Sequence, residues 1–236
     1  MTDETRREVP HPERYAFVPY PFERKAPEDM LASARAFTTS MRARRSVREF
    51  SDEPLPPGVL DEVIRAAGLA PSGANRQPWT FVVVTDPETK KKIREAAELE
   101  ERELYERRIS DEWREALEPL GTDANKPFLE IAPALVVVFR HVYGVDEDGQ
   151  RFTNYYTQES VGIAVGFFIA ALQHAGLVTL THTPSPMGFL GEVLGRPENE
   201  KAYVLLPIGY PAAGCEVPDI QKKPLDEIRV RVGPAT

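Results

Sequence analysis

Four short apolar runs stand out along the chain, and each is rich in β-branched residues. Runs of this composition are typical of buried β-strands. They are separated by stretches with helical spacing, and they fall at residues 80–84, 135–139, 177–181 and 203–210. Because the runs are apolar on both faces and alternate with helices, they predict an α+β fold, with an α/β-like mixed sheet flanked by helices.

The first two helices are predicted over residues 27–42 and from Pro57 to about Leu69. Proline is well tolerated in the first turn of a helix, where its missing N–H has no partner in any case. The second helix carries an apolar stripe at helical spacing, formed by Val59, Val63, Ile64 and Ala67. A turn at residues 68–73 follows it.

Two further helical stretches have opposite compositions. Residues 88–118 are dense in charge, with pairs such as Glu98 and Arg102 four residues apart, so we expect this stretch to be exposed and mobile. Residues 158–175 are apolar on all sides and contain many small residues, so we expect a helix buried all round. Such a helix suits the centre of a dimer, and the central helix of a monomer equally well.

Composition and charge narrow the class of protein. The chain has 236 residues, 42% of them hydrophobic, with a net charge of −8, a pI near 5.2 and a single cysteine, Cys215. An acidic chain without a basic stripe argues against nucleic acid binding. One cysteine excludes an internal disulfide framework and suits the cytoplasm. The first 25 residues have no apolar core of a signal peptide, and no apolar run is long enough to span a membrane.

No metal site is predicted. The histidines are scattered without metal-ligand spacing, and each is most simply a surface or packed residue: His11, His141, His174 and His182.

Candidate chemistry begins with the segment Arg44-Arg45-Ser46-Val47-Arg48. Guanidinium groups match the bidentate geometry of phosphate oxygens, and a cluster of them in an acidic protein points to a local anionic ligand. Solvated arginines or surface ion pairs are the alternative.

The turn Pro71-Ser72-Gly73-Ala74 offers a second anion site, because a positive φ at Gly73 would let successive N–H groups converge. An ordinary helix end and turn explains it as well.

These motifs occur in the order Arg44–Arg48, then Ala70–Ala74, then Gln77–Val84, and this order resembles the FMN-dependent nitroreductase superfamily. Within it, the chain is similar to the iodotyrosine deiodinase group over about residues 40–230. Thr181-His182-Thr183-Pro184 and Leu206-Pro207-Ile208-Gly209-Tyr210 continue the likeness. The resemblance implies a nitroreductase fold, an intertwined homodimer, and FMN as cofactor. It also implies one FMN-binding domain at 26–236, with a lid at about 88–128. Residues 1–25 are polar, charged and rich in proline and arginine, which predicts an extended arm, with a disordered tail as the alternative.

The resemblance further assigns cofactor contacts. It implies that FMN is held through its phosphate, ribityl chain and flavin ring by Arg44, Arg45, Ser46, Arg48, Pro71, Ser72, Gly73, Thr181, Thr183 and Lys222. Of these, Pro71, Ser72 and Gly73 would approach the flavin from the other subunit. Lys222, or alternatively Lys223, would close over the phosphate. The hydroxyl of Thr183 would hydrogen-bond the flavin N5 and favour one-electron steps, which makes Thr183 the candidate catalytic residue.

The substrate contacts implied by the resemblance lie mostly in the charged lid. Glu101 and Tyr105, four residues apart, share one face of a helix. With Lys126 they would grip the ammonium and carboxylate of a halogenated tyrosine, while the backbone N–H of Ala74 would contact its phenolate. On their own, Glu101 and Lys126 could equally be solvated charges. The segment 115–125 departs from the pattern of the group.

The implied reaction is reductive dehalogenation, converting iodotyrosine to tyrosine and iodide, with electrons from NAD(P)H or a reductase protein. A general NAD(P)H-dependent nitro- or quinone reductase on the same fold is the second hypothesis. A third is a flavin- or amino-acid-binding protein without catalytic activity. Glu101, Tyr105, Lys126 and Thr183 favour the first.

Overall fold

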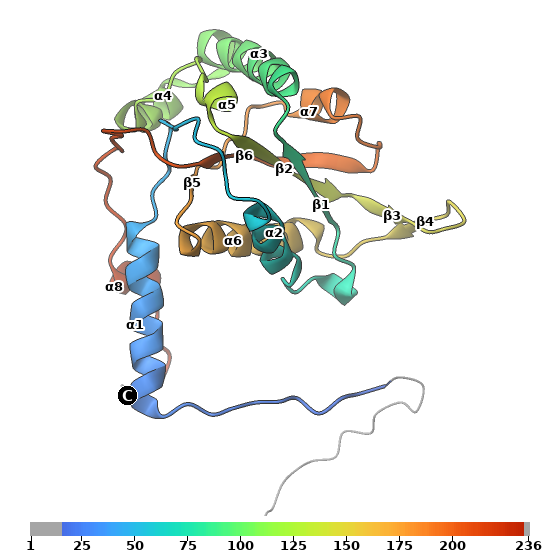
Figure 1. Cartoon of the computed structure of the whole chain (residues 1–236), viewed down its shortest axis with the longest axis vertical. Helices are drawn as coiled ribbons and strands as arrows, with labels where there is room; N and C mark the ends of the chain where they lie inside the picture. Colours follow the sequence, from blue (N-terminus) through green and yellow to red (C-terminus); the bar gives the residue numbers. More distant parts are fainter. Residues whose placement is uncertain (1–15, 234–236) are drawn as a thin grey trace, which may run out of the picture. The chain divides into compact units, whose positions relative to one another are not determined.

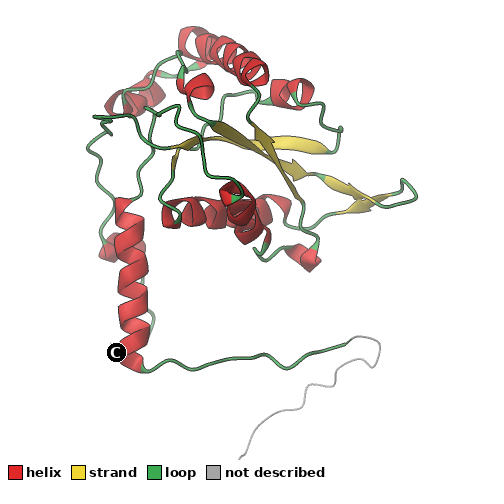
Figure 2. Ribbon diagram, viewed as in Figure 1, coloured by secondary structure: helices red, strands yellow, loops and turns green. Residues whose placement is uncertain are grey.

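The four apolar runs form one sheet in the computed structural model, which describes residues 16–233. Its strands are β1 (Trp79–Val84), β2 (Ala134–His141), β5 (Val178–Thr179) and β6 (Glu200–Gly209), in the order β1-β2-β6-β5 with antiparallel neighbours. A parallel bridge joins Ser46 to Thr179 beside them. Figure 1 and Figure 2 show helices on both sides of this sheet, so the α+β prediction is confirmed.

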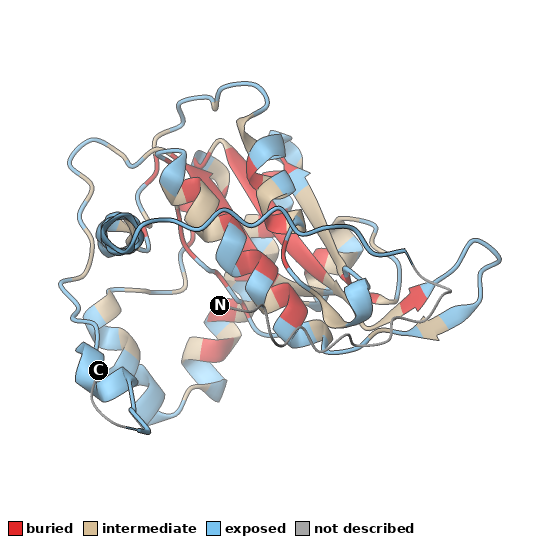
Figure 3. Ribbon diagram, turned by 90° about the horizontal axis from the view of Figure 1, so that it is seen from below, coloured by how far each residue is buried: buried red, intermediate tan, exposed pale blue. Residues whose placement is uncertain are grey.

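Burial on both faces of β2 divides the core into two clusters. Leu135, Val137 and Phe139 face one side and pack with α3 (Pro87–Glu103), α5 (Phe128–Ile131) and α7 (Gly188–Val193). Val136 and Val138 face the other side and pack with α2 (Val59–Gly68) and α6 (Thr157–His174). The buried residues therefore lie along the strands and on the helices that pack against them, and Figure 3 shows them in red on both. Successive side chains of a strand point to opposite faces, which explains why the β2 run is apolar at every position.

The third strand is shorter than predicted. β5 covers only Val178–Thr179, whereas the sequence predicts residues 177–181. The chain pairs again at His182, whose backbone N–H and C=O both bond Leu205. Thr181 thus lies outside the ladder, and Thr183 follows the isolated bridge.

Two helix predictions need correction. α2 begins at Val59 rather than Pro57, because Gly58 before it has a left-handed backbone with φ of 81°. The charged stretch is not one helix but α3, a five-residue π-helix η2 (Leu104–Arg108), α4 (Asp111–Leu117) and a 3₁₀ turn η3 (Glu118–Leu120). The expectation that few of its positions are buried is wrong on one face of α3, where Ile93 and Ala97 are fully buried.

α6 is not buried all round within a single chain. Val161 and Phe168 are fully buried, but Ile163 and Phe167 are 43% and 45% exposed. The exposed residues lie together on one side of the helix because they are four apart. α6 therefore covers the sheet with one face and leaves an apolar face uncovered in the chain as described.

Several short elements were not predicted from sequence. They are the hairpin of β3 (Tyr143–Val145) and β4 (Arg151–Thr153), the 3₁₀ turn η1 (Gly73–Asn75), α5, α7 and α8 (Leu225–Ile228). The N-terminal part forms a separate unit that ends at Thr38. In it, residues 16–26 have no helix or strand, and α1 (Pro27–Ala43) begins as predicted with no buried residue. Residues 1–15 of the predicted arm lie outside the described residues.

Candidate active site

One cavity of about 320 Å³ brings together half of the predicted cofactor and substrate residues. Its wall contains Ser46 and Arg48 from the arginine segment, Glu101, Tyr105 and Lys126 from the lid region, and Thr181 and Thr183 after β5. These residues come from three separate parts of the sequence. Apolar side chains complete the wall: Leu104, Trp113, Leu117, Leu120, Phe128 and Leu180. The cavity thus combines paired charges and hydroxyls with an apolar lining, as small-molecule sites commonly do.

The arginine segment reaches this cavity because it runs beside β5. The N–H of Val47 donates to the carbonyl of Thr179 at 3.2 Å, and the buried Val47 side chain anchors the segment in the core. Arg44 and Arg48 are half-buried, and among residues 16–233 neither guanidinium donates a hydrogen bond or forms an ion pair with another residue. Half-buried guanidinium groups with unused donors fit an anionic ligand such as a phosphorylated cofactor.

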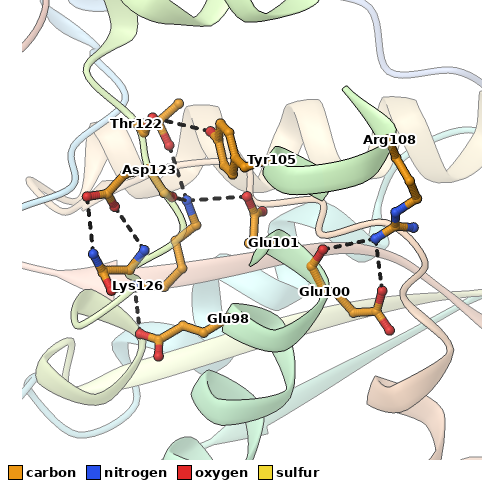
Figure 4. A network of polar contacts seen from close by, with 9 residues as sticks. Glu98, Glu100, Glu101, Tyr105, Arg108, Thr122, Asp123 and Lys126 are labelled. Atoms are coloured by element: carbon orange, nitrogen blue, oxygen red, sulfur yellow. Dashed lines mark hydrogen bonds and ion pairs between the residues drawn. The ribbon is translucent and has the colours of Figure 1, made fainter. Parts of the chain in front are cut away.

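The segment predicted as a lid, residues 88–128, contains a buried ion pair. The Nζ of Lys126 lies 3.5 Å from the Oε2 of Glu101, with side chains that are 4% and 9% exposed (Figure 4). Both the backbone and the side chain of Lys126 are hydrogen-bonded. Its backbone N–H donates to the Glu98 carboxylate at 2.8 Å, and its Nζ donates to the Thr122 hydroxyl at 3.2 Å. The Nζ also donates to the Asp123 carbonyl. The loop before α5 therefore fixes the lysine against the last turn of α3.

Tyr105 is positioned by the same loop. Its hydroxyl donates to the carbonyl of Thr122 at 3.2 Å, and its ring centre lies 6.0 Å from the Lys126 Nζ. Tyr105 belongs to η2, and the carbonyl of Tyr105 accepts a hydrogen bond of 2.8 Å from Arg114 of α4. Segments of π-helix are frequent at functional sites. The hydrogen bonds of Tyr105 therefore connect η2 with α4 and with the loop at Thr122.

Burial governs the protonation of these groups. It raises the pKa of the Glu101 carboxyl, while the Lys126 charge opposes the shift. It lowers the pKa of the Lys126 ammonium, and here the Glu101 charge opposes the shift. Burial also raises the pKa of the Tyr105 phenol, against the hydrogen bond to Thr122. Each charge of the pair is thus stabilised chiefly by the other, as expected for ions removed from water.

His182 lies between the two threonines and was treated in the sequence as an ordinary packed residue. It is 6% exposed, and its ring meets Phe128 edge-on at 5.9 Å. Burial lowers the pKa of its imidazole to about 3, and the charges of Lys126 and Arg48 act in the same direction. Its Nε2 is buried without a hydrogen-bond partner among the described residues. The histidine is therefore a neutral part of the cavity wall.

Other predicted site residues lie outside this cavity. The Arg45 guanidinium donates to the carbonyl of Pro218, and Lys222 is exposed in the C-terminal stretch. Arg44 does not line this cavity, and neither does the turn with Pro71, Ser72, Gly73 and Ala74. Within one chain, the structure does not bring these residues to Thr183.

The turn at Gly73 differs from the anion-binding geometry considered for it. The positive φ values occur at Ala74 (50°), Asn75 (52°) and Gln77 (47°), not at Gly73. The Gly73 N–H donates to the hydroxyl of Ser160 at 3.2 Å, so it is engaged within the chain. Glycine is required here for a different reason: an added Cβ would lie 2.5 Å from the carbonyl oxygen of Tyr155.

A larger cavity of about 970 Å³ is lined mainly by residues between 50 and 61, by the segment after β1 and by residues 130–134, and it contains none of the predicted site residues. Its buried lysine, Lys90, donates to the carbonyls of Glu130 and Ala132 at 2.7 and 2.8 Å. Lys90 thus holds the C-terminal end of α5 and is committed to the fold. We therefore assign the candidate active site to the smaller cavity, where titratable groups meet the free donors of Arg48.

Sequence reasoning missed the contribution of the loop before Lys126. Thr122 contacts Tyr105 through its carbonyl and Lys126 through its hydroxyl, while Asp123 contacts Lys126 through its carbonyl. Any residue type can supply a carbonyl, so sequence carries little signal for such contacts. For Glu101 a signal existed, because Lys90, Ile93, Ala97, Glu101 and Leu104 are spaced as one buried helical face.

The comparisons with known proteins agree with this fold and site. Residues 41–210 match the model of the Nitroreductase family, and the chain belongs to that family. Within it, the chain is similar to proteins named iodotyrosine deiodinase. It is 57% identical to the one from Haliscomenobacter hydrossis over 208 residues, which cover 88% of this chain and 94% of that relative. It is 44% identical to iodotyrosine deiodinase 1 of Homo sapiens, over 93% of this chain and 76% of the human protein.

A solved structure supports the same likeness. A crystal structure of oxidized iodotyrosine deiodinase bound to FMN and 3-iodo-L-tyrosine matches with a TM-score of 0.71 and 32% identity. The match covers 84% of this chain and all of that chain. A BluB-like flavoprotein from Clostridium difficile, 23% identical with a TM-score of 0.64, shares the fold. Among residues 16–233, no helix is long and apolar enough to cross a membrane.

Proposed function

We propose that this protein is an FMN-dependent reductive dehalogenase that converts iodotyrosine to tyrosine and iodide. The observation that carries the proposal is the Glu101–Lys126 pair, which shares one cavity with Tyr105, Arg48 and Thr183. A carboxylate suits an ammonium group and an ammonium suits a carboxylate, so this pair is chemically complementary to an amino acid zwitterion. The relatives named iodotyrosine deiodinase, at 44% to 57% identity, support the same assignment.

FMN is the proposed cofactor, and the arginine segment fits it. Arg44 and Arg48 have unused donors, Ser46 adds a hydroxyl, and Arg45 and Lys222 would reach the phosphate. The bound flavin supplies two electrons, and with one proton these replace the carbon–iodine bond by a carbon–hydrogen bond and release iodide. The hydroxyl of Thr183 would donate to the flavin N5, which makes it the proposed catalytic residue.

The protein's own contribution is to place the substrate and exclude water. Glu101 would bind the substrate ammonium, Lys126 its carboxylate, and Tyr105 would add a hydroxyl beside both. The apolar wall with Phe128 and Trp113 would enclose the halogenated ring. Removal of water strengthens the fixed charges around the ring, and a lid over about residues 88–128 serves this purpose.

A homodimer is part of the proposal. The turn from Pro71 to Ala74 lies outside the cavity of its own chain, so it would approach the flavin of a second copy, with the Ala74 N–H directed at the substrate phenolate. The exposed apolar face of α6, with Ile163 and Phe167, supports such an interface. We further propose NAD(P)H or a reductase protein as electron donor, and the cytoplasm as compartment, because a single cysteine suits a reducing environment.

The first experiment is a titration of the purified FMN-loaded protein with 3-iodotyrosine, followed by quenching of flavin fluorescence. Tyrosine and a nitroaromatic compound are the controls. Selective quenching by iodotyrosine, followed by iodide release after reduction, is the expected result. Absence of quenching together with rapid nitroaromatic turnover would reject this function in favour of a general nitroreductase. Binding without turnover under any reductant would indicate a flavin- or amino-acid-binding protein.

A further inference from the structure

Two glutamates of α3 contact the same lysine at different atoms. Glu101 pairs with the Nζ of Lys126, whereas Glu98 accepts a hydrogen bond of 2.8 Å from the Lys126 backbone N–H (Figure 4). Lys126 lines the candidate active-site cavity, and Glu98 does not. Glu98 can therefore act on a ligand in that cavity through the lysine rather than by contact.

The hydrogen bond to Lys126 is the one that the Glu98 carboxylate makes among residues 16–233, although arginines stand on both sides of it. Arg94 and Arg102 lie four residues before and after Glu98, with guanidinium nitrogens 4.0 and 3.8 Å from its carboxylate, beyond hydrogen-bond distance. The Glu98 side chain is 13% exposed. A carboxylate that accepts from a backbone N–H makes a charge-assisted bond, roughly twice as strong as a neutral one. The backbone of Lys126 is thus joined firmly to α3.

This bond differs from the other polar contacts of the loop at residues 121–126. Among residues 16–233, the hydrogen bonds and ion pairs between this loop and α3 are those of Glu98 and Glu101, and both end on Lys126. The bond from Tyr105 to the Thr122 carbonyl joins the loop to η2 instead. Because Glu98 binds the backbone, its contact does not depend on where the lysine ammonium points.

A fixed backbone matters for lysine because its four-carbon stem is flexible. The place of the Nζ depends on where the stem begins and on the acceptors at its far end. The Thr122 hydroxyl and the Asp123 carbonyl accept from the ammonium, and Glu98 fixes the other end of the stem. Groups that bind a ligand need such support, since they must be held within about 0.5 Å of the productive geometry.

From this geometry we infer that Glu98 is a positioning residue for Lys126. Its carboxylate oxygen fixes the lysine backbone, so that the ammonium meets the carboxylate of the bound amino acid. The inference rests on the proposed function, which assigns Lys126 to that carboxylate. It concerns reach rather than charge, because what the Lys126 N–H requires is an acceptor at hydrogen-bond distance.

The test uses two variants of Glu98 that separate reach from charge. Glu98→Asp keeps the carboxylate but shortens the side chain by one methylene, so the Lys126 N–H loses its acceptor. Glu98→Gln keeps the length and offers an amide oxygen to the same N–H without a charge. Dissociation constants for 3-iodotyrosine are measured by flavin fluorescence on the FMN-loaded proteins. Glu98→Asp is expected to weaken binding about tenfold, and Glu98→Gln by less than about threefold.

Glu95→Asp is the matched control. Glu95 is exposed on α3 and has no hydrogen bond or ion pair among residues 16–233, so the same substitution there changes the helix propensity and nothing else. It is expected to leave the affinity unchanged. Equal losses in Glu95→Asp and Glu98→Asp would attribute the effect to the helix. A loss in Glu98→Gln as large as that in Glu98→Asp would attribute it to charge, and either result overturns the inference.

A double variant tests whether Glu98 acts through the lysine ammonium. Lys126→Met removes the ammonium and keeps the backbone N–H. Glu98→Asp combined with Lys126→Met is expected to bind iodotyrosine within about twofold of Lys126→Met alone, because no ammonium is left to position. A further tenfold loss in the double variant would show that Glu98 acts on another group, which a general structural role would produce.

Failure of the inference and failure of the proposed function give different results. If the wild type binds iodotyrosine and Glu98→Asp binds it equally well, the inference is wrong and the function stands. If the wild type does not bind iodotyrosine, the proposed function itself is wrong. Should Glu98→Asp or Lys126→Met fail to fold, a tenfold loss of affinity in Glu98→Gln still overturns the inference.

Discussion

Gly73 lies so close to Tyr155 that a Cβ at position 73 would stand 2.5 Å from the Tyr155 carbonyl oxygen. The contact joins the turn after α2 to the residues just before α6. Because the obstacle is backbone, it cannot move aside like a flexible side chain. Gly73→Ala is therefore expected to lower the free energy of unfolding by about 1–3 kcal/mol, measured by denaturant titration. Gly68→Ala, at the end of α2 where nothing lies within 4 Å, is the control and should be neutral or stabilising.

The buried His182 predicts a pH dependence of stability. Its folded pKa is about 3, while an unfolded histidine titrates near 6.5, so between these values the unfolded chain binds the extra proton. Acidification from pH 6.5 towards 3 should therefore lower the free energy of unfolding by up to about 1.4 kcal/mol per pH unit from this residue. His182→Leu is expected to remove that slope. His174→Gln, at the exposed end of α6, should keep it, and an identical slope in wild type and His182→Leu would refute the assignment.

The lid charges should affect substrate and cofactor differently. Truncation of one partner of a buried, hydrogen-bonded charge pair costs about 2–5 kcal/mol of ligand binding, so Lys126→Ala should weaken iodotyrosine binding by about thirtyfold or more. The FMN content, measured from flavin absorbance, should remain that of the wild type, because Lys126 is assigned to the substrate. Loss of FMN from this variant would contradict that role.

Thr183 should act on turnover rather than on binding. Removing one donor aimed at the reacting group typically lowers the rate by about a hundredfold, so Thr183→Ala should reduce iodide release by about that factor. The dissociation constant for iodotyrosine should change little. Thr183→Ser keeps the hydroxyl and should retain most of the activity. Equal iodide release from Ala and Ser variants would remove Thr183 from the reaction.

The exposed apolar face of α6 predicts an interface. Phe167 is 45% exposed and Ile163 lies one turn before it, so Phe167→Asp would place a charge in the centre of the proposed dimer contact. Sedimentation at micromolar concentration should show a dimer for the wild type and a monomer for the variant. A monomeric wild type would exclude a site completed by a second copy.

The parts of the fold that sequence predicts well are those whose burial is uniform. The run from Leu135 to Phe139 is apolar at each position because both faces of β2 are covered, and its strand was predicted within two residues at either end. The hairpin of β3 and β4 escaped prediction because three-residue strands carry too little pattern. The burial of the charged stretch at residues 88–118 was predicted wrongly for a different reason. Its many glutamates and lysines made the buried face with Ile93 and Ala97 hard to recognise in the sequence.

For the candidate site, the residues could be predicted from sequence but their contacts could not. Ser46, Arg48, Glu101, Tyr105, Lys126, Thr181 and Thr183 were singled out from sequence, and one cavity contains them all. Their roles remain predictions. The Glu101–Lys126 contact could not be predicted, because it depends on how the loop at Thr122 returns to α3. Gly73 was singled out from the sequence, but the reason why glycine is required there was not predicted. That reason is the close approach of Tyr155, which only the folded chain shows.

The free guanidinium donors of Arg44 and Arg48 have a consequence for the protein in the cell. Neither guanidinium has an ion-pair partner among residues 16–233, and a bound phosphorylated cofactor would supply one. The folded population would then follow the concentration of the cofactor by mass action. Cells short of flavin would hold less of this protein at equal rates of synthesis, because its unliganded form would unfold and be degraded sooner. The supply of flavin would thus be one determinant of how much of this protein a cell holds.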